Sequence, residues 1–431
     1  MAQFLTHTDP DFDAAFAALL GQKREDAPDV DQAVAEIITD VRARGLDAVL
    51  ELTRRFDGWE IMPETLAFSP AEIDRAIAMI EPEDRAALEL AAARIEAYHR
   101  RQLPEDADWT DGTGVRLGWR WTAVEAAGLY VPGGQASYPS SVLMNAIPAR
   151  VAGVERLEIT APTPGGEVNP LVLLAARLAG IETVWRIGGA QAIAALAYGA
   201  GPIAPVDKIA GPGNAYVAAA KRRVFGRVGI DMIAGPSEVL VIADGAQDPD
   251  HIALDLLSQA EHDQSAQAIL ITDDAGFAEA AGAAVDARLE GLARRSIAGA
   301  SWEAHGAIIT ARDLAHAAEL TNRVAPEHLE LCVADPDALA AQIRHAGAIF
   351  LGGQAPEAIG DYVAGPSHVL PTARSARFSS GLSVLDFMKR SSLIGLSPAA
   401  LAEIGPVAET LAQSESLEAH GLSVRARLGN R

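Results

Sequence analysis

Short apolar runs rich in Ile, Leu and Val alternate with Ala-rich stretches of helical spacing from about residue 114 onward. Turn residues separate the two kinds of stretch, which indicates strands that are each followed by a helix. Strands that are apolar on both faces are typical of parallel sheets covered by helices on both sides. The pattern predicts one such sheet within about 130–238 and another within about 239–381. The predicted strands are 156–160, 183–187, 239–243, 268–272, 307–310, 329–333 and 348–351.

The two ends of the chain differ from this middle part. Apolar residues recur at three- and four-residue spacing in 29–56 and 70–101, which predicts helices interrupted at Gly45, Gly58 and Pro82. The end of the chain is expected to begin extended at 383–387 and to finish in helices over 401–411 and 416–428. The fold class is therefore α/β, with two incomplete Rossmann-like parallel-sheet domains, an N-terminal helical segment and a C-terminal helical tail. The expected bounds are 1–26 for the helical segment, 27–129 plus 239–381 for the first α/β domain, 130–238 for the second and 382–431 for the tail.

Charge and cysteine content exclude several classes of function. The chain of 431 residues carries 58 acidic and 35 basic side chains, a net charge of −23. This balance opposes nonspecific binding to nucleic acid or to an anionic membrane surface. A charged segment followed by an apolar one is absent at the start, and so is any apolar run of membrane-spanning length, so we expect a cytoplasmic protein. The single cysteine, Cys332, lies in an apolar run and is expected to be structural.

Three Gly-rich segments in the 130–238 block follow predicted strands. Glycine lets backbone N–H groups approach a phosphate closely, and the helix that follows adds partial positive charge. Tight strand–helix turns would have the same composition, and the spacing is not that of the G-x-G-x-x-G fingerprint. Three such loops together favour a dinucleotide crevice at the carboxyl edge of the strands. The segments are 130–134, 188–191 and 211–214, in which Tyr130, Gln191 and Asn214 are the candidate contacts.

Four of the ten histidines lie near carboxylates, and three of them lie at Gly- or Pro-marked boundaries. Imidazole beside carboxylate suits both metal ligation and proton transfer. Gln259 and His262 are three residues apart in a helical pattern and so share one face. With Asp361 and His420 they would form a nitrogen and oxygen ligand set that fits zinc, or manganese or cobalt in its place. A polar patch at a helix end is the alternative for Gln259 and His262.

Glu327 and His328 follow Pro326 at the start of a predicted strand. A histidine can take a proton from an alcohol near neutral pH, and a carboxylate can activate water. A solvated loop with a charged pair explains the pattern equally well. In the tail, Glu415 and His420 are five residues apart, about 140° around an ideal helix, so they could bracket a small ligand without sharing one atom. A tail that does this is expected to reach into a neighbouring subunit.

These segments together resemble the histidinol dehydrogenase family over nearly the whole chain. The resemblance implies NAD-dependent, four-electron oxidation of L-histidinol to L-histidine through bound L-histidinal, at the end of histidine biosynthesis. It also implies a zinc ion that orients the substrate, and a homodimer with shared active sites. The segments that carry it are 130–134, 138–145, 186–192, 208–214, 234–238, 259–263, 326–328, 360–371 and 378–384.

The resemblance also implies roles for single residues. Glu327 and His328 would transfer protons, and Tyr130, Gln191 and Asn214 would contact NAD. The first α/β domain would then carry the metal and acid/base residues, the 130–238 domain would bind the dinucleotide, and the tail would reach the partner subunit. The implied zinc ligands are Gln259, His262, Asp361 and His420. The implied substrate contacts are Ser237, Gln259, His262, His328, Asp361, His368, Glu415 and His420.

Two other readings stay open at the level of sequence. A relative on the same scaffold could oxidise another small alcohol, such as a sulfonated diol. Glu415 and His368 suit a cationic amine and an imidazole, whereas a sulfonate would call for arginine or lysine. A protein that binds a metal or a nucleotide without catalysis is the second reading, and NADH formation on addition of histidinol separates it from an enzyme.

Overall fold

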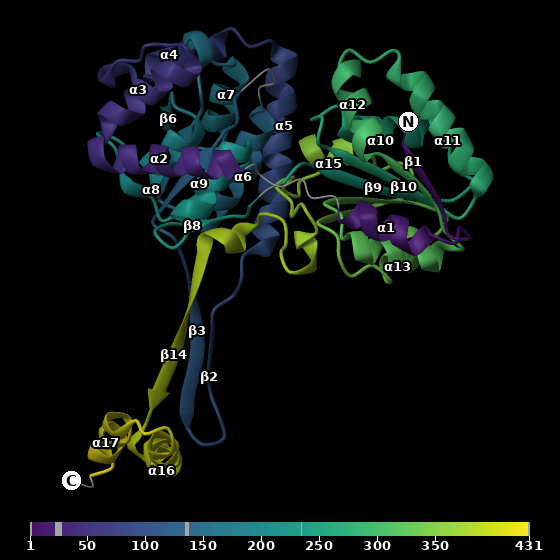
Figure 1. Ribbon diagram of the computed structural model, residues 1–431. Helices are drawn as coiled ribbons and strands as arrows, with labels where there is room; N and C mark the ends of the chain where they lie inside the picture. Colours follow the sequence, from purple (N-terminus) through teal and green to yellow (C-terminus); the bar gives the residue numbers. More distant parts are fainter. Residues whose placement is uncertain (1, 22–27, 134–137, 234, 430–431) are drawn as a thin grey trace.

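The computed structural model describes residues 2–21, 28–133, 138–233 and 235–429. Two α/β lobes lie side by side, and a long arm extends away from them (Figure 1). Each lobe is built on a parallel sheet covered on both faces, so the predicted fold class is confirmed. Among the described helices, none combines the length and the apolar composition that crossing a membrane would require.

The larger sheet has six strands in the order β1-β11-β10-β9-β12-β13, all parallel. Every residue of β9 and β10 is buried, because helices cover both faces. Leu240 and Ile242 pack against α1 and α13, whereas Val239 and Val241 pack against α10, α11 and α12. The strands are β1 (Gln3–Thr6), β9 (Glu238–Ala243), β10 (Gln267–Thr272), β11 (Ala307–Thr310), β12 (His328–Cys332) and β13 (Ala348–Leu351). The helices are α1 (Phe12–Leu20), α10 (Pro249–Ala260), α11 (Ala275–Leu289), α12 (Arg295–His305), α13 (Leu314–Val324) and α14 (Pro336–Ala340).

The smaller sheet has five parallel strands in the order β6-β5-β4-β7-β8. Helices α2, α3, α8 and α9 share one core with it, and α4, α5, α6 and α7 share a second core on its other face. The strands are β4 (Ala126–Tyr130), β5 (Arg156–Thr160), β6 (Thr183–Trp185), β7 (Lys208–Ala210) and β8 (Gly229–Ile230). The helices are α2 (Pro28–Arg44), α3 (Leu46–Asp57), α4 (Pro70–Ala78), α5 (Pro82–His99), α6 (Pro139–Ala152), α7 (Pro170–Leu178), α8 (Gly189–Tyr198) and α9 (Ala215–Val224).

The N-terminal helices pack on a different lobe from the one to which they were assigned from sequence. We expected 27–129 to share a domain with 239–381, but α2 contacts α8 and α9, and α5 contacts α6, all in the five-stranded lobe. Conversely, the 1–26 segment is not only helical, because β1 forms the edge of the six-stranded sheet beside β11. Helical spacing shows that a helix has an apolar face, but it does not show which sheet that face covers.

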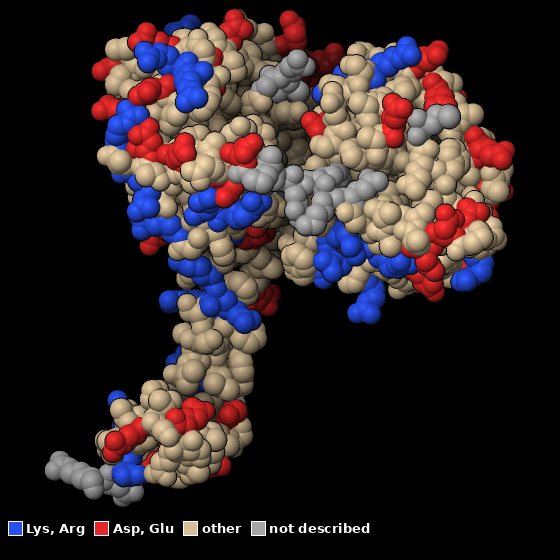
Figure 2. Space-filling view, viewed as in Figure 1, with Lys and Arg blue, Asp and Glu red and all other residues tan. Residues whose placement is uncertain are grey.

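The arm is a three-stranded antiparallel sheet in the order β14-β3-β2, with two helices at its tip. Its side chains form a separate mass that stands clear of both lobes (Figure 2). The two tail helices are confirmed, but 383–387 is not extended: it contains the 3₁₀ turn η5 (Val384–Phe387), and the strand begins one residue later. The elements are β2 (Ala107–Thr110), β3 (Val115–Ala123), β14 (Met388–Leu396), α16 (Pro398–Ser414) and α17 (Glu418–Arg427).

Candidate active site

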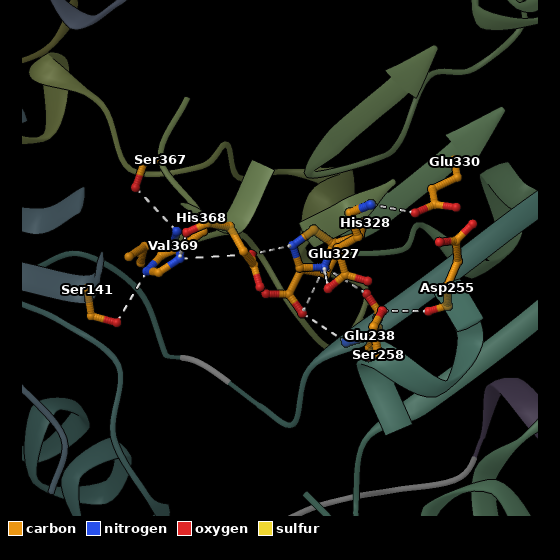
Figure 3. Close-up of polar contacts among 12 residues, drawn as sticks. Ser141, Glu238, Asp255, Ser258, Glu327, His328, Glu330, Ser367, His368 and Val369 are labelled. Carbon is orange, nitrogen blue, oxygen red and sulfur yellow. Dashed lines mark hydrogen bonds and ion pairs between the residues drawn. The ribbon is translucent and has the colours of Figure 1, made fainter. Parts of the chain in front are cut away.

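Glu327 and His328 lie at the amino edge of the six-stranded sheet, where β12 begins beside β9. Both are buried, with 5% and 4% of their surfaces exposed. The backbone of Glu238, at the start of β9, contacts both of them (Figure 3). Its N–H donates to Glu327 Oε2 at 2.9 Å, and its carbonyl oxygen accepts from His328 Nδ1 at 3.0 Å. Because a carbonyl can only accept, Nδ1 carries the proton, and the lone pair of His328 lies on Nε2.

The protonation state of His328 follows from its surroundings. Burial lowers the pKa of His328 to about 4, Asp361 and the Glu238 carbonyl oppose this shift, and the nearby charges of His368 and His262 add to it. The imidazole is therefore neutral near pH 7. Nε2 is buried and has no hydrogen-bond partner among the described residues, so it is placed to accept a proton.

A second segment brings Asp361 and His368 to the same place. Asp361 belongs to α15 (Glu357–Tyr362), and its Oδ1 lies 3.8 Å from His328 Nε2 and 3.8 Å from His368 Nδ1. His368 Nδ1 donates to the Asp361 carbonyl oxygen at 3.0 Å. The Ser141 hydroxyl then donates to His368 Nε2 at 3.2 Å, as the dashed line in Figure 3 shows. Because Ser141 lies on α6 of the other lobe, the site is at the junction of the two lobes.

Gln259 and His262 lie at the C-terminal end of α10. Gln259 is fully buried, yet neither its amide oxygen nor its amide nitrogen has a hydrogen-bond partner among the described residues. An unpaired buried amide calls for a ligand, since leaving it unpaired costs free energy. His262 follows in the turn after the helix, near enough for its charge to lower the pKa values of His328 and His368. An amide oxygen, an imidazole and the Asp361 carboxylate make a donor set that fits a divalent ion such as zinc.

The structure offers a second possible set of metal ligands that overlaps the first. One ligand atom each from His328, Glu357 and Asp361 lies within 4.8 Å of the others. Asp361 belongs to both sets, whereas Glu357 was not singled out in the sequence. If His328 Nε2 bound a metal, it could not act as a base, so the two sets make different predictions for a substitution of His328.

Glu415 and His420 are not brought to this site within one chain. Both are exposed on the arm tip, where Glu415 follows the last residue of α16 and His420 lies in the first turn of α17. Ser416, with a positive φ of 59°, turns the chain between the two helices, so the two residues do not lie on one straight helix. Figure 1 shows α17 far from β9 and α15. Ser237, by contrast, directly precedes β9 and lies at the same sheet edge as Glu238.

The candidate dinucleotide contacts lie at the carboxyl edge of the five-stranded sheet. Tyr130 is buried, and its hydroxyl accepts from the Gly189 N–H at 3.1 Å. The Asn214 side chain caps α9 by accepting from two backbone N–H groups, and Gln191 is buried in α8. A cavity of about 70 Å³ lies at the same edge, and its lining includes Gly133 and Pro162. Gly134, the last residue of the expected segment 130–134, and Ala234, the first residue of the expected segment 234–238, lie outside the described residues.

Comparisons with known proteins agree with one another. A model of the histidinol dehydrogenase family matches residues 20–428. The chain belongs to the histidinol dehydrogenase family. It is 73% identical over 428 residues to the histidinol dehydrogenase of Cereibacter sphaeroides, covering 99% of each chain, and 71% identical to that of Ruegeria pomeroyi, again covering 99% of each. The crystal structure of histidinol dehydrogenase from Elizabethkingia anophelis matches with a TM-score of 0.95 at 35% identity, covering 99% of this chain and 98% of the other.

The family assignment confirms the predicted resemblance and the enzyme class, a dehydrogenase. An acetylating aldehyde dehydrogenase from Geobacillus thermoglucosidasius has the same fold to a lesser degree, with a TM-score of 0.50 at 12% identity. That likeness concerns the fold alone.

Acidic residues behind the candidate active site were missed from the sequence. Glu330, two residues after His328, is fully buried, and its Oε1 accepts from the Glu357 N–H at 2.6 Å. Burial raises the pKa of Glu330 well above its usual value, and the neighbouring Asp255 adds to this. Burial also raises the pKa of Asp255 to about 6. A charged residue inside the apolar run 329–333 was the one feature of the sequence that could have revealed this cluster.

Proposed function

We propose that this protein oxidises L-histidinol to L-histidine through bound L-histidinal, with NAD as the hydride acceptor and zinc as the bound metal. The observation that carries the proposal is the arrangement of His328. Its Nδ1 proton is held by a backbone carbonyl, and its Nε2 lone pair lies on the side of Asp361. This arrangement presents a neutral base at the junction of a metal-ligand cluster and a dinucleotide-type lobe.

The metal is proposed to bind Gln259, His262 and Asp361, with His420 supplied by the arm of a second copy. When bound, the ion would hold the imidazole and amino nitrogens of the substrate and so orient it. Support comes from the orphaned amide of Gln259 and from the convergence of α10 and α15 on one sheet edge. The remaining substrate contacts are proposed to be Ser237, His368 and the arm residue Glu415, whose carboxylate suits a cationic amine.

The two proton-transfer residues take different steps. His328 Nε2 accepts the hydroxyl proton in each oxidation, first from the substrate alcohol and then from the hydrated aldehyde, while the hydride goes to NAD. Between the two oxidations Glu327 draws a proton from the water that adds to the aldehyde. The Glu238 backbone fixes both side chains, so neither must be reoriented between steps. Cys332 is 2% exposed, and burial raises the pKa of its thiol, which agrees with a route that forms no thiohemiacetal.

NAD is proposed to bind across the carboxyl edge of the five-stranded sheet, in contact with Tyr130, Gln191 and Asn214. The N-termini of α8 and α9 lie at this edge and favour the negative charge of a pyrophosphate. The small cavity beside Gly133 and Pro162 lies at the same edge.

A homodimer is proposed because the arm of a single chain leaves large apolar side chains uncovered. Its helices and strand expose large apolar side chains that a second copy would cover. The exposed fractions are 72% for Ile394, 60% for Val407, 58% for Leu411, 42% for Leu417 and 48% for Leu422.

The test is the amount of NADH formed per histidinol consumed, with and without a chelator. The proposal predicts two NADH per histidinol, loss of turnover in the chelator and recovery on addition of zinc. A sulfonated diol consumed in preference to histidinol would contradict the proposed substrate. NADH formation that resists complete removal of metal would contradict the role of zinc.

A further inference from the structure

Gly211 follows β7 at the carboxyl edge of the five-stranded sheet, and both of its polar backbone groups are held by buried charges. Its N–H donates to Asp231 Oδ2 at 2.8 Å, and its carbonyl oxygen accepts from Lys221 Nζ at 2.9 Å. Lys221 and Asp231 also form an ion pair with each other. The N–H and the carbonyl oxygen of Gly211 are thus both hydrogen-bonded to the two members of one ion pair.

The ion pair is buried, with 3% of the Lys221 side chain and none of the Asp231 side chain exposed. Lys221 comes from α9, Asp231 follows β8, and Gly211 begins the segment that leads into α9. Burying two charges is costly, and replacing such a pair by apolar side chains is often neutral or stabilising. Stability alone therefore does not account for placing a charged pair here, whereas fixing the backbone of Gly211 does.

The backbone of Gly211 packs closely against the backbone of Tyr130. Its φ is +124°, and a Cβ at this position would lie 2.1 Å from the carbonyl oxygen of Tyr130. The segment after Gly211 ends in Asn214, whose side chain caps α9. By holding Gly211, the pair Lys221–Asp231 fixes the position of Asn214, at the start of α9, relative to Tyr130 on β4. Both are candidate dinucleotide contacts.

From this geometry we infer that Lys221 and Asp231 are positioning residues, which hold the 211–214 segment in the conformation that binds the dinucleotide. They act through the backbone of Gly211 and do not touch the substrate. The inference rests on the proposed use of NAD. It predicts that the pair affects cofactor affinity and leaves the chemistry of His328 unchanged.

The experiment compares the holoenzyme with the double variant Lys221→Met/Asp231→Leu, which removes both charges together. The dissociation constant and KM for NAD should rise by about tenfold, as expected when hydrogen bonds that order a binding loop are lost. The KM for histidinol and kcat at saturating NAD should stay near the parent values, whereas the melting temperature should fall, because the buried N–H and carbonyl of Gly211 lose their partners. The matched control is Arg223→Met/Asp31→Leu, which removes an exposed ion pair of the same helix that ties α9 to α2.

A second measurement does not depend on how well the double variant folds. Amide hydrogen exchange of the 211–217 segment should be slow in the parent and faster in Asp231→Asn, with the β9 segment unchanged in both. A double variant that keeps the parent affinity for NAD, or an unchanged exchange rate in Asp231→Asn, would overturn the inference. If the parent binds NAD but forms no NADH from histidinol, the proposed reaction fails. The dissociation constants for NAD still test whether Lys221 and Asp231 position the 211–214 segment. If the parent binds no dinucleotide, both fail.

Discussion

The two proposed sites lie at opposite edges of the two parallel sheets, and this difference matches the charges of the ligands proposed for each. At the amino edge of the six-stranded sheet, α10 ends next to the site, with Gln259 in its last turn. At the carboxyl edge of the five-stranded sheet, α8 and α9 begin. A helix end of the first kind carries partial negative charge and favours cations, and a helix start carries partial positive charge and favours anions. A metal ion and a cationic amine suit the first edge, and a pyrophosphate suits the second.

The edges also differ in the groups that they present. The amino edge gathers histidines and acids whose pKa values are shifted by burial, such as His328 and Glu330. The carboxyl edge presents backbone N–H groups, neutral side chains and a glycine held by a buried ion pair. We propose that the amino edge serves proton transfer and metal ligation and that the carboxyl edge binds the dinucleotide through the conformation of its backbone. Substitutions at the two edges should therefore change different kinetic constants.

The largest effect is expected for His328→Asn. Loss of the base should lower kcat for both oxidations by roughly 10²–10⁴-fold. Zinc content, measured by atomic absorption, and the dissociation constant for NAD should not change. Loss of the metal together with activity would show that His328 is a ligand, as the group of His328, Glu357 and Asp361 allows.

The next effect is expected for His262→Ala. Removing a direct ligand should weaken zinc binding by about a hundredfold or more, since even groups that only orient ligands contribute 10–100-fold. The measurement is competition for zinc with a chelator of known affinity. His251→Ala, on the exposed part of the same helix, serves as the control. Full zinc retention in His262→Ala would remove the metal assignment at this edge.

A smaller effect is expected at the other edge, for Tyr130→Phe. The hydroxyl accepts one hydrogen bond, from Gly189, and its loss should raise the dissociation constant for NAD about three- to tenfold. The KM for histidinol should not change, and Tyr216→Phe, an exposed tyrosine on α9, is the control. An increase in the KM for histidinol instead would mean that the two edges are not separate in function.

The last prediction concerns stability and not a kinetic constant, and it is made for metal-free Glu330→Gln. The pKa of Glu330 is raised in the folded protein. Above about pH 4.5 the unfolded chain therefore releases a proton that the folded protein retains, and the free energy of unfolding falls as the pH rises. Glutamine cannot ionise, so this loss disappears in the variant.

The melting temperature of Glu330→Gln relative to the parent should therefore increase from about pH 5 to about pH 8. The corresponding gain in the free energy of unfolding is at most about 1.4 kcal/mol per pH unit. Parallel thermal melts at several pH values measure it. A constant difference across this range would mean that Glu330 ionises in the fold as it does in the unfolded chain.

The sequence predicts the parts of this structure that depend on local pattern. The run 239–243 is apolar at every position, and 268–272 at all but Thr272, because both faces of their sheet are covered. Both runs were predicted as strands. The glycine loops and the histidines near carboxylates were also found from local sequence. The hairpin of β2 and β3 was missed although the signal was local, because Val115, Leu117, Trp119 and Trp121 alternate with Arg, Gly and Thr residues, as in a half-buried strand.

Other features depend on contacts between distant segments. Nothing local reveals that α2 packs on α8, or that Glu357, after Pro356, enters the core beside Glu330. The buried pair of Lys221 and Asp231 looks like two surface charges until the fold brings β8 and α9 together. Sequence pattern therefore gave elements and candidate residues, and the tertiary structure gave their partners.

The arm has a genetic consequence under the proposed dimer. Each chain keeps His328 in a lobe and His420 on the arm, so every complete site would draw on two polypeptides. An allele that lacks His328 and an allele that lacks His420 would each encode an inactive enzyme when expressed alone. Expressed in one cell, they would form mixed molecules in which one of the two sites is whole, and growth without added histidine would return.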